Sequence, residues 1–231
     1  MFEKSVEELT ELGAQITTAE IAQQPELWRD TLNIYRENKE AIEAFLAEAR
    51  AMGEGRLSVV FTGAGTSDYV GDTCAPYLRH AGNTDLYDFK PIATTDIVSA
   101  PRDFLRAEDP TLVVSFARSG NSPESLAAVA VAKELVHNVK FLNITCAPEG
   151  KLAVESADDP NALTLLIPRA NDKGFAMTGS YSCMTLLSTL FSTLPLTSRR
   201  PSGSRRLPRW ARRSSPVSPR SPITWLAIST A

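Results

Sequence analysis

Cysteine and histidine are scarce in this chain of 231 residues, which bears on metal and redox chemistry. The three cysteines are Cys74, Cys146 and Cys183, and the two histidines are His80 and His137. They lie far apart and form neither a CxxC pair nor a Cys/His cluster with the spacing of metal ligands. The sequence therefore predicts no metal site, and it predicts that the three thiols are free and buried.

Long apolar runs are missing as well. The first residues, MFEKSVEELTELGAQ, lack the basic start and the apolar core of a signal peptide. No apolar run approaches the roughly 18–20 residues that span a bilayer. These absences predict a cytoplasmic chain without a membrane partner.

Acidic residues are absent from the last part of the chain. Residues 196–231 contain eight arginines and no Lys, Asp or Glu, which leaves 16 basic and 27 acidic residues, a net charge of −11, in residues 1–195. Arg, Ser and Pro make up 21 of these last 36 residues, and such a composition buries too little apolar surface to fold. We therefore predict a disordered tail and interpret it as frameshifted translation of a GC-rich gene. A basic tail that binds nucleic acid is the alternative, which the sequence favours less.

The rest of the chain alternates short apolar runs with helical periodicities. Residues 1–52 have a helical pattern, in which Pro25 suits a helix that begins just before Trp28. Strands are predicted at 57–62, 111–116, 140–145 and 163–167, with a weaker one at 86–89. Helical spacing predicts two inward faces, formed by Val70, Cys74, Tyr77 and Leu78 and by Ala127, Ala130, Val131 and Leu135.

This alternation predicts an α/β fold with three α/β/α layers around a parallel, flavodoxin-like sheet, preceded by N-terminal helices. We divide the chain into a helical lead-in (1–52), an α/β domain (53–195) and the tail (196–231). Parallel sheets of this kind bind ligands at the carboxyl ends of their strands.

The first glycine-containing loop, Gly63–Ser67, follows the first predicted strand. It is either a tight turn that binds nothing or a ligand loop, since it offers backbone N–H groups and the hydroxyls of Thr66 and Ser67. A dinucleotide loop would have glycine where Asp68 stands, and that carboxylate would repel a pyrophosphate. A Walker loop is excluded because no Gly-Lys-Ser/Thr follows, so the sequence calls for no nucleotide cofactor.

The second loop, Ser119–Ser122, follows the strand at 111–116. Ser122 precedes Pro123, so it reads as a helix N-cap with proline in the first helical position. The alternative is that Ser122 does nothing more than cap its helix. Ser119, Gly120 and Asn121 add a hydroxyl, a backbone N–H and an amide at a helix N-terminus, where the helix dipole favours an anion. Two such loops at one sheet edge predict a phosphate or sugar-phosphate site that needs no metal.

These segments resemble a known family. GAGTS and ARSGNSPES resemble the two phosphate-binding loops of sugar isomerase (SIS) domains, and TAEIAQQPELW resembles the E-I-x-x-Q-P stretch ahead of the isomerase domain of glucosamine-6-phosphate synthase. Residues 174–184 resemble the segment of that family that lines the sugar site and begins the next helix. The resemblance covers roughly residues 15–195 and is to the galactosamine-6-phosphate deaminase/isomerase type, also described as tagatose-6-phosphate ketose/aldose isomerase.

The resemblance implies a substrate site and a partner. It implies that a sugar 6-phosphate is held by hydroxyls and backbone of the two loops and of residues 174–184, with the site residues Gly65, Thr66, Ser67, Ser119, Gly120, Asn121, Ser122 and Thr178. Phe175 and Met177 match sugar-proximal positions, whereas Ala117 and Arg118 depart from the serine and glutamine of glucosamine-6-phosphate synthase. The resemblance further implies that the full-length protein is a homo-oligomer.

The resemblance also implies where the chemistry lies. Members carry two SIS domains, and the glutamate base and the ring-opening histidine lie in the second one. We therefore expect this chain to contain no catalytic residue and to be an inactive fragment of an amino-sugar isomerase or deaminase. The alternative is a single SIS domain that senses a sugar phosphate, as in transcriptional regulators.

Overall fold

The computed structural model describes residues 2–193. The predicted tail lies outside the described residues. Among the described residues, no helix combines the length and the apolar composition needed to cross a membrane.

The predicted parallel sheet is confirmed, with five strands that run in the same direction. They are β1 (Leu57–Gly63), β2 (Tyr87–Pro91), β3 (Thr111–Ala117), β4 (Val139–Thr145) and β5 (Ala162–Leu166). Their order in the sheet is β2-β1-β3-β4-β5, so the chain crosses over β1 when it passes from β2 to β3. Every residue of β1 and β3 is buried, as expected for central parallel strands that are covered on both faces.

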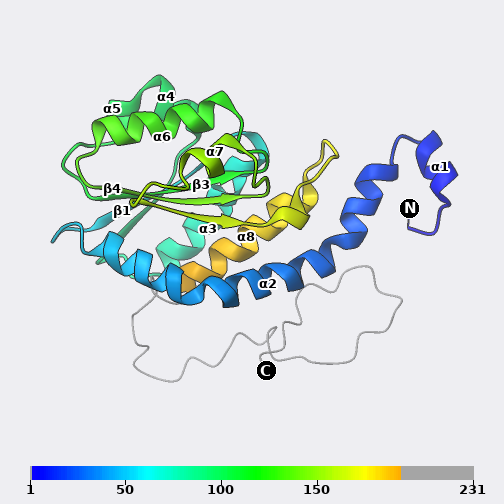
Figure 1. Ribbon diagram of the computed structural model, residues 1–231, viewed down its shortest axis with the longest axis horizontal. Coiled ribbons are helices and arrows are strands. Elements are labelled where there is room, and N and C mark those ends of the chain that lie inside the picture. The colour runs from blue at the N-terminus through cyan, green and yellow to red at the C-terminus, as the bar shows by residue number, and fades with distance from the viewer. Residues whose placement is uncertain (1, 194–231) are drawn as a thin grey trace. The chain divides into compact units, whose positions relative to one another are not determined.

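Helices cover both faces of the sheet and complete the three layers (Figure 1). One face carries α3 (Asp68–Ala81), α8 (Thr178–Thr193) and the N-terminal α2 (Gln15–Arg50); the other carries α4 (Thr94–Ser99), α5 (Pro101–Phe104), α6 (Pro123–Leu135) and α7 (Lys151–Glu155). Side chains alternate between two cores along β1, since Val59 and Phe61 face one and Val60 faces the other. The three-layer α/β/α prediction is therefore correct.

The N-terminal region is helical, but its long helix does not begin at Pro25. α1 (Val6–Glu11) is followed by α2, which runs through Pro25 without interruption. Proline removes one backbone hydrogen bond there, yet α2 lies along α8 and buries Leu27, Tyr35 and Ile42 in the same core as the sheet. Packing along the whole helix outweighs the single lost bond, so the local proline signal was misleading.

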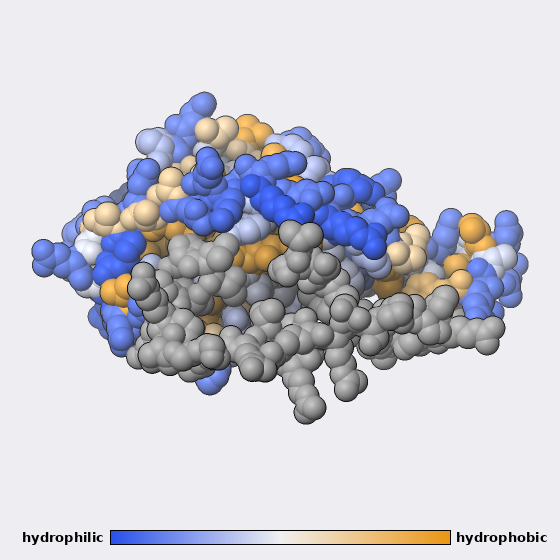
Figure 2. Space-filling view, turned by 90° about the horizontal axis from the view of Figure 1, so that it is seen from below, coloured by the Kyte–Doolittle hydropathy of each residue, from blue (hydrophilic) through white to orange (hydrophobic). Residues whose placement is uncertain are grey.

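Several apolar side chains are exposed on and near α1, among charged ones. Phe2, Val6, Leu12 and Ile16 are between 53% and 64% exposed. Figure 2, which views the molecule from below Figure 1, shows apolar atoms on this N-terminal part beside a largely hydrophilic surface.

Two predicted helix faces need correction. In α3, Val70, Cys74 and Leu78 are buried as predicted, but Tyr77 is 48% exposed. In α6, the buried positions are Ser125, Ala128 and Ala132, not the predicted stripe at 127, 130, 131 and 135. Alanine and valine occupy most sides of α6 itself. The difference in polarity between its sides is therefore too small to indicate which side faces the sheet.

The three cysteines are free and buried, as predicted. Burial raises the pKa of the Cys146 thiol to about 12 and that of Cys183 to about 11. Both thiols are therefore protonated at neutral pH and are poor nucleophiles.

Candidate functional site

The two predicted loops begin at neighbouring strands. In the sheet register Gly63 of β1 pairs with Phe116 of β3, so the loops that follow these strands leave the same edge side by side. This position, between β1 and β3, is where the strand order reverses. In open α/β sheets that switch point is the usual place for a ligand.

The first loop is a single turn of 3-10 helix, Gly65–Ser67, that leads into α3. Gly65 has a φ of +59°, and Ser67 is buried. The Gly63 carbonyl, where the loop starts, accepts a 3.0 Å hydrogen bond from the Thr94 hydroxyl at the start of α4. Sequence reasoning missed Thr94, whose only signal was its place after the neighbouring strand.

The second loop is built around a helix cap. Gly120 has a φ of +66°, a conformation that costs other residues free energy, and Ser122 caps α6 by accepting the Ser125 N–H at 3.3 Å. The Ser122 and Ser125 hydroxyls lie 2.6 Å apart. The capping role of Ser122 is thus confirmed, and its hydroxyl is already engaged. Ser119 Oγ accepts the Asn121 N–H at 3.4 Å, which leaves its proton able to point to a ligand.

Asn121 and Arg118 tie this loop to its surroundings. The Asn121 side-chain oxygen accepts the Lys151 N–H at 3.0 Å, and the Gly120 carbonyl accepts the Leu152 N–H at 3.0 Å, so the loop satisfies the first turn of α7. Arg118 is half-buried and donates to the backbone carbonyl of Asp172. Arg118 therefore links the second loop to the segment that precedes α8.

Carboxylates distinguish the two helix N-termini at this edge. Asp68 opens α3, and the pKa of its carboxyl is raised by burial and then by the nearby charges of Asp72 and Asp96. An anion would meet negative charge at α3, whereas α6 carries only the exposed Glu124 in its first turn. The electrostatics therefore favour α6 for a phosphate, with the first loop beside it.

The raised pKa of Asp68 predicts a pH-dependent stability. The pKa of Asp68 in the folded protein lies above the ordinary aspartate value. Ionisation of Asp68 therefore lowers the folding stability as the pH rises from the ordinary pKa through the raised one. Asp68→Asn should therefore be more stable than the wild type at pH 7, and this difference should vanish near pH 3. Urea unfolding at both pH values measures it, with the exposed Asp103→Asn as control. A variant that is less stable than wild type at pH 7 would contradict the assignment.

Thr178, the last predicted site residue, lies at the start of α8 and not on either loop. Met177 before it has a φ of +51°, a left-handed conformation that is rare outside glycine. Asp172 Oδ2 accepts the Ser180 N–H at 2.7 Å and the Ser180 hydroxyl at 2.8 Å, so this carboxylate caps α8. Asp172 and Arg118 connect Ser180, in the first turn of α8, to the second loop. Asp172 was missed by sequence reasoning, since no spacing rule singles it out.

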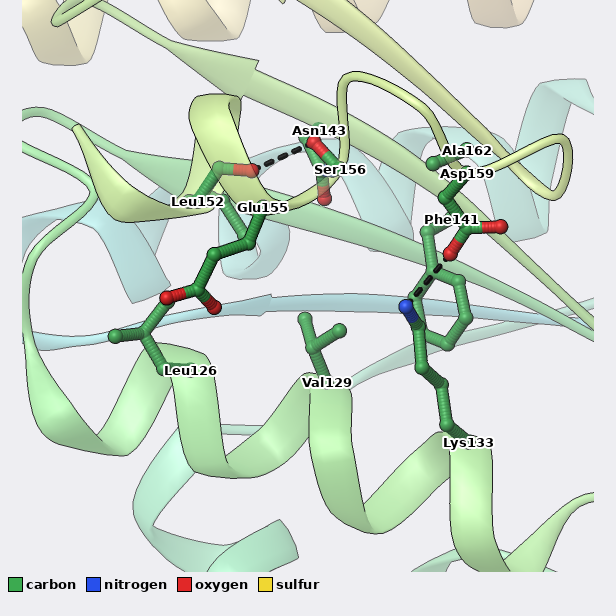
Figure 3. A pocket seen from close by; sticks show the side chains of 10 residues that line it. All are labelled: Leu126, Val129, Lys133, Phe141, Asn143, Leu152, Glu155, Ser156, Asp159 and Ala162. Carbon is green, nitrogen blue, oxygen red and sulfur yellow. Dashed lines mark hydrogen bonds and ion pairs between the residues drawn. The ribbon is translucent and has the colours of Figure 1, made fainter. Parts of the chain in front are cut away.

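A cavity of about 50 Å³ lies elsewhere, between α6, α7 and β4 (Figure 3). Lys133 and Asp159 form a 2.6 Å ion pair at one end, and the buried Asn143 lines it with a side-chain oxygen that has no partner among the described residues. No predicted site residue lines this cavity. One water needs roughly 10–15 Å³, so this volume holds only a few waters. The cavity therefore suits ordered water more than a sugar phosphate.

Both histidines lie at the opposite edge of the sheet from the loops. His80 is in the last turn of α3, and the His137 N–H donates to the Ala107 carbonyl ahead of β3. The loops thus have no histidine beside them. Among residues 2–193, no group of three or more His, Cys, Asp or Glu side chains is placed to hold a metal ion.

The parallel sheet with glycine loops at its switch point defines the class, which is an open α/β domain that binds its ligand at the carboxyl ends of the strands. No protein-family model matches the chain. A relative from Streptomyces coelicolor is 48% identical over 176 residues, which cover 75% of this chain and 44% of the relative. The D-galactosamine-6-phosphate deaminase AgaS of Shewanella sp. ANA-3 is 42% identical over 187 residues, covering 80% of this chain and 48% of the relative.

A solved structure agrees with these relatives. The tagatose-6-phosphate ketose/aldose isomerase of Escherichia coli superposes with a TM-score of 0.68 at 37% identity, covering 76% of this chain and 46% of the other. The chain is therefore a homologue of the AgaS proteins over the residues that it shares with them, and it has the SIS fold of these relatives. It spans about half the length of the relatives that it matches.

Proposed function

We propose that this chain binds a sugar 6-phosphate, with an amino-sugar or ketohexose 6-phosphate as ligand, at the edge between β1 and β3. The observation that carries the proposal is the pair of loops on adjacent strands at the switch point, with α6 opening behind the second loop. The relatives named for galactosamine 6-phosphate and tagatose 6-phosphate support this ligand class.

The chemistry of the two loops suits this ligand. Hydrogen-bond donors to phosphate oxygens would come from Ser119, the backbone around Gly120 and the N-terminus of α6. Thr66 and Ser67 lie in the first loop, which follows the neighbouring strand β1. No metal is required for such a site, because helix N-termini and hydroxyls bind phosphate directly. The sugar would then extend toward residues 171–178, which Arg118 joins to the second loop.

Calorimetric titration of the 231-residue chain tests the proposal. Galactosamine 6-phosphate and tagatose 6-phosphate should bind, inorganic phosphate should bind more weakly, and galactosamine without phosphate should not bind detectably. Binding of the free sugar as tightly as its phosphate would overturn the site, because the loops at the switch point would then contribute nothing.

The same samples should show no turnover. Aldose–ketose isomerisation and deamination both move protons and need a base and an acid that work near pH 7. Both histidines stand at the far edge of the sheet, and the resemblance puts the catalytic pair in a second SIS domain. Ammonia release from galactosamine 6-phosphate, followed by a coupled assay, should equal the rate without protein. Sustained release by sequence-verified protein would show that this chain holds its own catalytic groups.

A further inference from the structure

Residues 171–177, here called the α8 entry loop, are held by a buried carboxylate from a distant helix. Glu20 of α2 is 7% exposed, and its Oε1 accepts the N–H groups of Lys173 at 2.7 Å and Gly174 at 2.8 Å. The contact spans more than 150 residues of sequence. One carboxylate oxygen therefore fixes two successive peptide units of the loop.

The same loop is fixed from two further sides. Asp172, 3% exposed, caps α8 through Ser180, and Arg118 of the proposed phosphate loop donates to the Asp172 carbonyl. Between these attachments the backbone reaches the left-handed conformation of Met177. Such a conformation persists in a residue other than glycine only when the surroundings hold it. Glu20 is thus part of a frame that sets the path of the loop beside the phosphate-binding edge.

The burial of Glu20 is unfavourable if its only role is to stabilise the fold. The second carboxylate oxygen, Oε2, is buried and has no partner among the described residues. Burying a carboxylate with an unsatisfied oxygen is unfavourable, and a neutral side chain would leave less charge uncompensated. At the outer end of the loop, Phe175 is 97% exposed, so its ring makes little contact with the rest of the domain. The loop is held firmly at its base while it offers an uncovered aromatic side chain.

We propose that Glu20 is a positioning residue for sugar recognition: it fixes the α8 entry loop so that the loop contacts the sugar part of a ligand whose phosphate lies on the second loop. The proposal rests on the proposed function. It assigns the two ends of the ligand to different elements, because Glu20 contacts the α8 entry loop and neither phosphate loop. Loss of Glu20 should therefore weaken sugar recognition and leave phosphate recognition intact.

The test compares two ligands on the full chain. Glu20→Ala should weaken the binding of galactosamine 6-phosphate at least tenfold while the affinity for inorganic phosphate stays within twofold of wild type. Glu20→Gln should recover most of the loss, because its amide oxygen accepts the same two N–H groups. Glu26→Ala is the matched control, since Glu26 lies on the same helix but pairs at the surface with Arg169 and should change neither affinity.

Hydrogen exchange supplies a readout that does not need a ligand. The amides of Lys173 and Gly174 should exchange faster in Glu20→Ala than in wild type or Glu20→Gln. Unchanged exchange, an equal loss of both ligands, or full retention of galactosamine 6-phosphate affinity would each overturn the proposal. If the wild type binds neither ligand, both the proposed function and the positioning role of Glu20 are wrong. If it binds inorganic phosphate normally and Glu20→Ala spares the sugar phosphate, only the role of Glu20 fails.

Discussion

Ser119→Ala should weaken the binding of a hexosamine 6-phosphate by about ten- to a hundred-fold, because a hydrogen bond to a charged oxygen contributes roughly 1.5–3 kcal/mol. Ser119 is well suited to such a test. Its hydroxyl accepts only a long N–H contact of 3.4 Å from Asn121, within the part of the chain that the structure describes, so the fold depends little on it. Calorimetric titration measures the affinity, and urea unfolding should give the wild-type free energy.

Two serines serve as comparisons for Ser119. Ser122→Ala removes the cap of α6 and should cost about 1 kcal/mol of stability as well as affinity. Ser99→Ala, at the exposed end of α4, should change neither quantity. If Ser119→Ala binds the sugar phosphate as tightly as Ser99→Ala does, Ser119 does not contact the phosphate and the site assignment is wrong.

Gly150→Ala should destabilise the protein by about 1–3 kcal/mol, the usual cost of forcing an extra group into a packed site. Gly150 precedes α7, and a Cβ there would lie 2.2 Å from the carbonyl oxygen of Ser119. The Ser119 carbonyl belongs to the backbone and the new Cβ is bonded directly to it, so neither group can rotate away. The second loop must therefore shift to accept the methyl group. Because that shift moves Ser119, sugar-phosphate affinity should fall together with stability.

The matched control for this substitution is Gly55→Ala. A Cβ at Gly55 would meet nothing within 4 Å, so this variant should unfold at the wild-type urea concentration or slightly above it. Wild-type stability of Gly150→Ala would show that the second loop does not lie against the start of α7. Wild-type affinity in a destabilised Gly150→Ala would instead separate the packing of the loop from its proposed binding role.

Much of the site followed from local sequence. The cap at Ser122, the proline after it and the glycines at 65 and 120 are determined by backbone geometry within a few residues, and the structure has the cap and both left-handed glycines. The strands also followed, because continuous apolar runs between turn residues are typical of central parallel strands. The sequence by itself therefore determined the fold class, the two loops and their place at the carboxyl ends of strands.

The tertiary structure alone decided what those local signals could not carry. It made β1 and β3 neighbours, chose which side of α6 faces the sheet, and continued α2 through Pro25. It also brought Arg118 to Asp172, 54 residues away, and Glu20 to Gly174, 154 residues away. Contacts between residues this far apart depend on how finished helices and strands pack, and no periodicity or motif within either segment encodes the identity of its partner.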